Sequence, residues 1–293
     1  MPKLTIELAV ILLILGNIAA VFSDVFIKDL PLDTAIYQFV LFRQLTAVLL
    51  LLPFCLFNKK SRLFNGVKWH FIRAHIWLLG AVCMVISLTG LPLATVNAIF
   101  YTAPLLMLPL GMILYKDKFC LNSLIAATVG FIGVLIIVKP TQINVAALAA
   151  LGVALSIAIN HLLVRKLPSH HNVFQTLLLT NLVGIPTVIG LTLWENKPWD
   201  WQPLITAAVS NIFILIYAGI CVLVYRAVEA NKVSSAEYTG LLSAVAAGIF
   251  WFDEIPDFSL AIGAILIITP IIWLTKTEAK KKRKKDLINN VHL

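Results

Sequence analysis

Residues 203–226 read PLITAAVSNIFILIYAGICVLVYR, and no charged residue precedes Arg226 in this stretch. A helix needs about 20 predominantly apolar residues to cross a bilayer, so the stretch is long enough. No water reaches the backbone inside hydrocarbon, and the peptide groups must therefore bond to one another as a helix. The stretch predicts a membrane-spanning helix and, with it, the fold class.

Other apolar runs of similar length precede and follow this one. The 293 residues are 60% hydrophobic and 13% charged, whereas a soluble domain averages about 25% charged residues. We therefore expect an all-α integral membrane protein with ten transmembrane helices, and its first partner is the lipid bilayer. The expected spans are 4–27, 34–57, 72–91, 94–115, 121–139, 143–164, 173–194, 203–226, 231–252 and 258–275.

Lysine and arginine are distributed unequally between the two sides of these spans. Nineteen of them lie on the side of the N-terminus, while the other side has Lys28, Lys139 and Lys197. Arg43 lies inside the second span. Basic loops stay in the cytoplasm, so both termini are predicted to be cytoplasmic in a multi-pass protein of the inner membrane. A net charge of +9 that is placed in this way does not indicate nucleic-acid binding.

The chain repeats itself at an offset of 137 residues, the difference between 27 and 164. IKDLP at 27–31 matches VRKLP at 164–168, and the matches continue through three other helices at Gln38 and Gln175, Tyr101 and Tyr238, and Asp117 and Glu254. Each half has five expected spans, an odd number, so the second half is inverted. The predicted organisation is a first repeat at 1–140, a second at 141–276 and a basic cytoplasmic tail at 277–293.

These repeats resemble a known family. The run LPLA at 91–94 that leads through Tyr101 and Pro104 to Asp117 is similar to the EamA-type signature of the drug/metabolite transporter superfamily. The family usually has glycine where this chain has Lys116 and Asp253. A shorter match, SDV at 23–25 with EIP at 254–256, resembles a branch that includes S-adenosylmethionine carriers. The resemblance implies a carrier of amino acids or related metabolites without a bound prosthetic group.

Glu237 is the polar residue that most requires an explanation. It lies inside the ninth expected span, where a charge costs several kcal/mol, and its repeat equivalent is Phe100. We expect it to bind a cationic group of the substrate or a coupled proton; the alternative is a structural ion pair. Tyr238 and its equivalent Tyr101 are predicted to line the same central cavity, unless they serve only in helix packing.

Further polar residues in the spans are candidates for the site. Arg43 either binds a substrate carboxylate or clamps helix-end carbonyls or an acid such as Asp24. Asp24 and His161 are repeat equivalents and are predicted to gate opposite mouths, with hydration near helix ends as the alternative. Weaker substrate-binding candidates, for which packing or hydrogen bonding between helices is the alternative, are Asn97, Asn17, Asn160 and Trp77.

The sequence has no HExxH, GxSxG or Walker motif, and its four cysteines lack metal-ligand spacing. We therefore expect no enzyme, no cofactor and no metal. The predicted function is secondary transport, by alternating access or as a uniporter, of a small polar or amphipathic metabolite. An amino acid or a derivative is favoured, and S-adenosylmethionine or another cationic metabolite is the alternative. A channel-like pore and a lipid-headgroup enzyme are the rivals, and both a monomer and a homodimer remain open.

Overall fold

A computed structural model describes most of the chain. The described residues are 4–56, 66–115, 121–138 (without the side chains of 123, 124 and 127), 144–168, 170–228, 236, 239–270, 272–273 and 276. All regular structure in these ranges is helical. Glu237 and Tyr238 lie outside the described residues.

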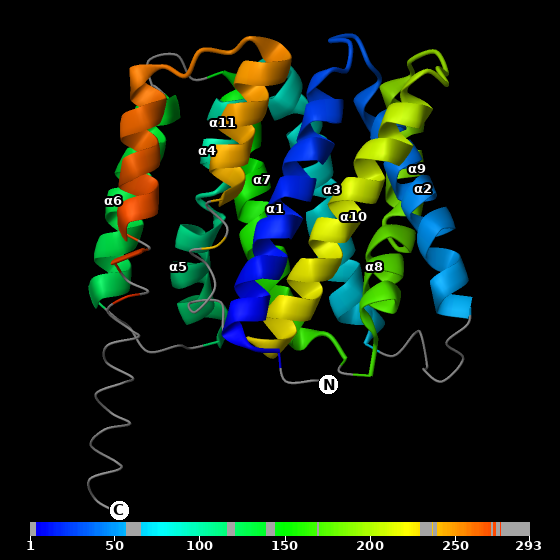
Figure 1. Ribbon diagram of the computed structural model, residues 1–293. Helices are drawn as coiled ribbons and strands as arrows, with labels where there is room; N and C mark the ends of the chain where they lie inside the picture. The colour runs from blue at the N-terminus through cyan, green and yellow to red at the C-terminus, as the bar shows by residue number, and fades with distance from the viewer. Residues whose placement is uncertain are drawn as a thin grey trace, which may run out of the picture.

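The helices form a bundle whose members run side by side (Figure 1). We call the end at which α1 begins the proximal end, and the end with the α1–α2 and α9–α10 connections the distal end. The helices are α1 (Ile6–Lys28), α2 (Ile36–Leu56), α3 (Val67–Gly90), α4 (Leu93–Phe100), α5 (Ala103–Tyr115), α6 (Leu121–Val138), α7 (Val145–Leu163) with the 3-10 turn η2 (Val164–Lys166), α8 (Val173–Leu182), α9 (Ile185–Glu195), α10 (Pro203–Ala227), α11 (Thr239–Phe252) and a last apolar helix, Phe258–Pro270.

Seven segments of the described chain are long and apolar enough to cross a membrane. They coincide with expected spans one to four and six to eight, whereas the other three expected spans contain shorter apolar helices in the described ranges. Large apolar side chains on the outside of the bundle are exposed, among them Leu49 at 68% and Phe250 at 81%. Such a surface is stable only against lipid, which agrees with a membrane-embedded protein.

Two of the expected spans are not continuous helices, in contrast to the sequence prediction. The fourth is divided at Tyr101–Thr102 into α4 and α5, and the seventh at Val183–Gly184 into α8 and α9. Each break comes shortly before a proline, Pro104 or Pro186, which has no N–H to donate to the preceding turn. Each proline is the second residue of the helix that follows the break, where its missing N–H costs no helical hydrogen bond.

The glycine at the second break lies close to a side chain of α2. A Cβ on Gly184 would lie 2.7 Å from Nε2 of Gln44, whose side chain is buried. A larger residue would therefore require the Gln44 amide to move away from the α8–α9 break. Elsewhere in the bundle, α1 packs along α10 and α3 packs along α7.

Candidate functional site

Two buried residues of opposite charge lie in the distal half of the bundle. Asp24 of α1 is 3% exposed and Arg43 of α2 is 6% exposed. Asn97 Nδ2 donates a hydrogen bond to Asp24 Oδ2 at 3.0 Å and a second to the carbonyl of Leu93 at 3.2 Å. Arg43 Nη1 has only the weak acceptor Met84 Sδ, at 3.8 Å. The sequence left open a clamp of Arg43 on helix-end carbonyls or on an acid such as Asp24; in the structure Nη1 contacts a thioether of α3, and Asp24 is the acid that interacts with Arg43.

The two charges interact electrostatically but do not form a salt bridge. Asp24 Oδ1 and Arg43 Nε are both buried without a hydrogen-bond partner. A buried charge is costly unless hydrogen bonds and a counter-charge compensate it. The arrangement thus leaves one acceptor and one donor of opposite charge unused, and a ligand that carries both charges would satisfy them.

Below this pair, the break between α4 and α5 lies at mid-height in the bundle. α4 ends and α5 begins close to the start of α11 (Figure 1). Asn17 Nδ2 donates to the carbonyl of Ala236 at 3.2 Å, while Asn17 Oδ1 is buried without a partner. Tyr101 Oη lies against Gly240, where an added Cβ would overlap it. Polar groups at helix ends inside a membrane bundle are typical of substrate sites in transporters.

Asn17 and Asp24 lie on one helix, about two turns apart. The structure therefore brings together five of the expected site residues in two adjacent layers along α1. The upper layer contains Asp24, Asn97 and Arg43, and the lower layer contains Asn17 and Tyr101.

The remaining expected residues lie elsewhere. His161 of α7 is buried and its ring lies 4.6 Å from that of Tyr225, so hydration at a helix end does not explain it. Asn160 Nδ2 bonds to the carbonyl of Ser156 within α7, and Asn160 Oδ1 is buried without a partner. Trp77 packs between two apolar clusters of the proximal half.

Arg73 is the buried charge that the sequence analysis missed. It was counted among the nineteen basic residues on the side of the N-terminus, at the edge of the expected span 72–91, but α3 begins at Val67 and buries Arg73 to 3% exposure. Its Nη1 donates to Thr180 Oγ1 of α8 at 2.8 Å. An earlier start of the third span would have placed this arginine in the membrane, although no local pattern would have shown that Thr180 contacts it.

Lys28 and Glu254 join three segments at the distal end. Lys28 Nζ lies 3.0 Å from Glu254 Oε1 and donates to the carbonyl of Leu91 at 2.8 Å. Glu254 Oε2 accepts the N–H of Leu93, the first residue of α4, at 2.7 Å. A carboxylate at a helix N-terminus is favoured by the unpaired N–H groups there. We call this set the distal staple.

Removing the charge of the staple should destabilise the protein. We expect Glu254→Gln to lower the free energy of unfolding by about 1–3 kcal/mol, because the Lys28 pair and the charged cap of α4 are both lost. Asp253→Asn is the matched control, since it removes an exposed charge from the adjacent residue. The measurement is thermal unfolding in detergent, and equal melting temperatures for Glu254→Gln and the wild type would contradict the role of the staple.

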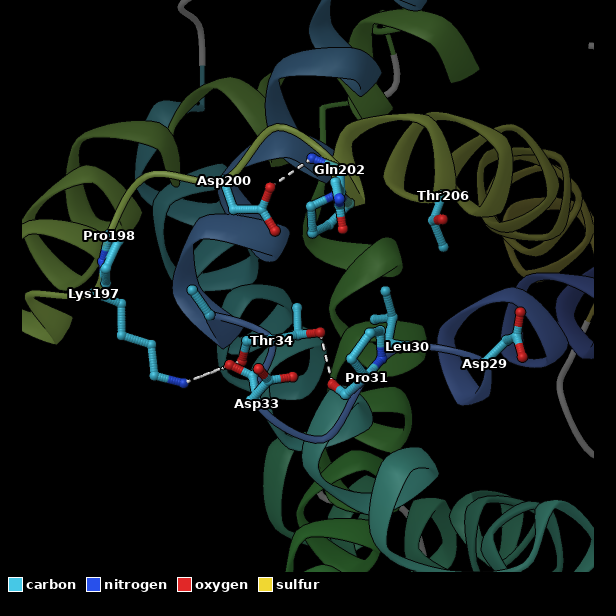
Figure 2. Close-up of a pocket in the computed structure, with 12 residues that line it drawn as sticks. Asp29, Leu30, Pro31, Asp33, Thr34, Lys197, Pro198, Asp200, Gln202 and Thr206 are labelled. Atoms are coloured by element: carbon cyan, nitrogen blue, oxygen red, sulfur yellow. Dashed lines mark hydrogen bonds between the residues drawn. The ribbon is translucent and has the colours of Figure 1, made fainter.

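An open pocket of about 510 Å³ lies at the distal end, between the α1–α2 and α9–α10 connections (Figure 2). Asp29, Asp33 and Asp200 line it, together with Lys197, whose Nζ donates to the carbonyl of Asp33 at 2.9 Å. None of the expected site residues lines this pocket. The pocket is open at the distal surface, whereas Asp24 is buried inside the bundle.

The family model for the EamA-like transporter family matches residues 7–139 and again residues 144–276. The chain belongs to the EamA-like transporter family. The resemblance seen in the sequence is thereby confirmed, and this membrane protein is a transporter and not an enzyme.

Named relatives of this EamA-like transporter carry different solutes. The S-adenosylmethionine uptake transporter of Rickettsia prowazekii is 24% identical over 93% of this chain and 94% of its own. The riboflavin transporter of Vibrio cholerae is 26% identical over 82% of each chain. The pseudopaline exporter of Pseudomonas aeruginosa is 22% identical over 92% of this chain and 96% of its own. Uptake and export both occur among these relatives, so the family does not set the direction.

A crystal structure of another protein has the same fold as this EamA-like chain. It superposes with a TM-score of 0.61 at 13% identity and covers 92% of this chain and 96% of its own. At this identity the likeness concerns the fold alone.

One departure from the family pattern has a structural explanation. Asp253, where the family usually has glycine, has a φ of 50° in the turn after α11. Glycine adopts this left-handed conformation without steric cost, and aspartate is among the few other residues that tolerate it. The turn directs Glu254 to α4. The other departure, Lys116, lies outside the described residues.

Proposed function

We propose that this EamA-like protein is a secondary transporter that moves an amino acid derivative with both a cationic and an anionic group across the inner membrane. The supporting observation is the unjoined pair of Asp24 and Arg43. Asp24 Oδ1 would accept from the cationic group of the solute, and Arg43 Nε would donate to its carboxylate. The bound solute would thus supply the hydrogen-bond partners that Asp24 Oδ1 and Arg43 Nε lack without it.

We further propose ten spans in two inverted five-helix repeats, with both termini in the cytoplasm and the distal end outside. The family model matches the chain twice, which supports a duplicated unit. The helix break at Tyr101–Thr102 corresponds, at the offset of 137, to residues 238–239, and α11 begins at Thr239. Helix ends at these equivalent points would place the substrate between the repeats, and the repeats would alternate access around it.

S-adenosylmethionine is the first candidate for the solute. The Rickettsia prowazekii relative that matches nearly the whole chain is an uptake transporter for it. Its methionine part has a carboxylate and an ammonium group, and its sulfonium is a second cation. These charges suit the acid and base of the distal half, and Glu237 would supply a further acid in the second repeat.

The test is transport by the purified protein in liposomes. We expect saturable uptake of radiolabelled S-adenosylmethionine and counterflow when the unlabelled compound is loaded inside. The comparison solutes are methionine, which keeps the carboxylate and the ammonium group but lacks the sulfonium, and riboflavin, which has neither a carboxylate nor a cationic group. Uptake that does not saturate and shows no counterflow would indicate a pore, and transport of riboflavin alone would refute the zwitterion proposal.

A further inference from the structure

The proximal half of the bundle contains a second buried arginine, Arg73, with a histidine and a half-buried arginine beside it. Arg73 is 3% exposed, and His70, one turn earlier on α3, is fully buried. Arg226 comes to the same region from the last turn of α10. In the described part of the chain, no carboxyl group interacts electrostatically with Arg73; the groups that do are Arg226, His70, His161 and Cys221.

Hydrogen bonds hold these cations in place without neutralising them. Arg73 Nη1 donates to Thr180 Oγ1 at 2.8 Å, and Thr180 Oγ1 donates to the carbonyl of Thr176 at 2.8 Å. Arg226 donates to Thr176 Oγ1 at 2.9 Å and to the carbonyl of His171 at 2.6 Å. Every acceptor in this network is a neutral oxygen. The network therefore orients the guanidinium groups and, among the described residues, supplies no anionic acceptor to them.

One edge of the Arg73 guanidinium has no acceptor. Its Nε is buried without a hydrogen-bond partner, and so is Nδ1 of His70. A buried cation is strongly destabilising unless an anion and hydrogen bonds compensate it. The planar edge of a guanidinium matches the two oxygens of a carboxylate. Thr180 already occupies Nη1, so the Nε edge remains for a single carboxylate.

We propose that Arg73, oriented by Thr180, binds the carboxylate of the transported solute when the site is open to the proximal side. This inference rests on the proposed function and assigns a second anion subsite to it.

The repeat supports the placement of this subsite. At the offset of 137, Thr180 is the equivalent of Arg43, and His161 is the equivalent of Asp24. Arg73 thus interacts with the positions that correspond to the distal charge pair. Each half of the bundle then has one buried arginine for the same acid group, in keeping with a solute that passes from one half to the other.

The test compares S-adenosylmethionine with its carboxyl methyl ester in sided proteoliposomes. For the wild type, we expect the KM on the proximal side to be about 30-fold lower for the acid than for the ester. Arg73→Gln should reduce this ratio to below about 3-fold, because the ester has already lost the group that Arg73 recognises. The KM on the distal side should not change. Arg165→Gln, at an exposed arginine of the same end, is the matched control and should keep the wild-type ratio.

A binding measurement tests the same proposal if Arg73→Gln folds poorly. Sodium acetate, compared with sodium chloride, should raise the melting temperature of wild-type protein in detergent, and Arg73→Lys should weaken this effect because lysine lacks the planar fork. Stabilisation by inorganic phosphate and not by acetate would overturn the carboxylate assignment.

Two further outcomes would refute the inference while leaving transport established. The first is an equal acid-to-ester ratio in the wild type and Arg73→Gln. The second is evidence of an internal ion pair between Arg73 and Glu237. In that case the double variant Arg73→Gln/Glu237→Gln would regain the stability that Arg73→Gln loses, and its acid-to-ester KM ratio would equal that of the wild type. If the wild type transports no tested solute, the proposed function fails, and acetate binding still tests Arg73 on its own.

Discussion

Asp24→Asn should reduce transport of S-adenosylmethionine by roughly 30- to 1,000-fold, which corresponds to the loss of one charge-assisted contact in a buried site. The asparagine has the same shape and still offers an oxygen to Asn97. It cannot, however, balance the charge of Arg43 or of a cationic solute. The measurement is the initial rate of uptake per folded molecule in liposomes.

Stability must be measured on the same variant. Removal of Asp24 leaves Arg43 as an uncompensated buried cation, a change that commonly costs about 3–5 kcal/mol. Asp24→Glu retains the charge and should recover part of the transport. Asp29→Asn makes the same chemical change at an exposed position just beyond α1 and should leave transport unaltered. Wild-type uptake by well-folded Asp24→Asn protein would contradict the proposed role of the acid.

Glu237→Gln is expected to have the second large effect, a loss of transport of more than about tenfold with little change in folding. Glu237 follows Ala236, which is buried and whose carbonyl is held by Asn17. The repeat equivalent of Glu237 is Phe100, so the duplicated scaffold does not require an acid at this position. Glutamine retains the size of the side chain and removes only its charge.

Three quantities on this variant distinguish the possible roles of the acid: uptake, exchange of labelled for unlabelled solute, and melting temperature. Loss of uptake and exchange indicates substrate binding. Loss of pH-driven uptake with intact exchange indicates a coupled proton. A lower melting temperature with unchanged transport per folded molecule would show a structural role and refute the functional one. Glu7→Gln, at an exposed acid of α1, is the matched control.

Part of the candidate site was predictable because charge inside an apolar run is visible in the sequence. Asp24, Arg43 and Asn97 were identified individually in this way, and the structure shows that they lie together. The residues of the staple were present in the quoted motifs, but their contact was not predicted. Lys28 and Glu254 are far apart in the chain, and only the packing of α1 beside α4 and α11 brings them into contact.

Arg73 was misplaced for a related reason. An apolar run shows that a span exists more reliably than it shows where the span begins. A few polar residues can precede the run in the same helix and still be buried by packing. The contact of Arg73 with Thr180 depends on how α3 lies against α8. Pro104 and Pro186 mark the two helix breaks in the sequence. No feature of the sequence showed that the α4–α5 break lies close to the start of α11.

The sequence by itself determined the membrane environment, the approximate positions of the helices and the family. These properties depend on local apolar length and on short motifs, both of which are read along the chain. The tertiary structure decided which buried charges meet and which lack a partner. That result depends on contacts between distant segments, since a hydrogen bond or an ion pair is set by a few ångströms of helix placement that no single run of residues specifies.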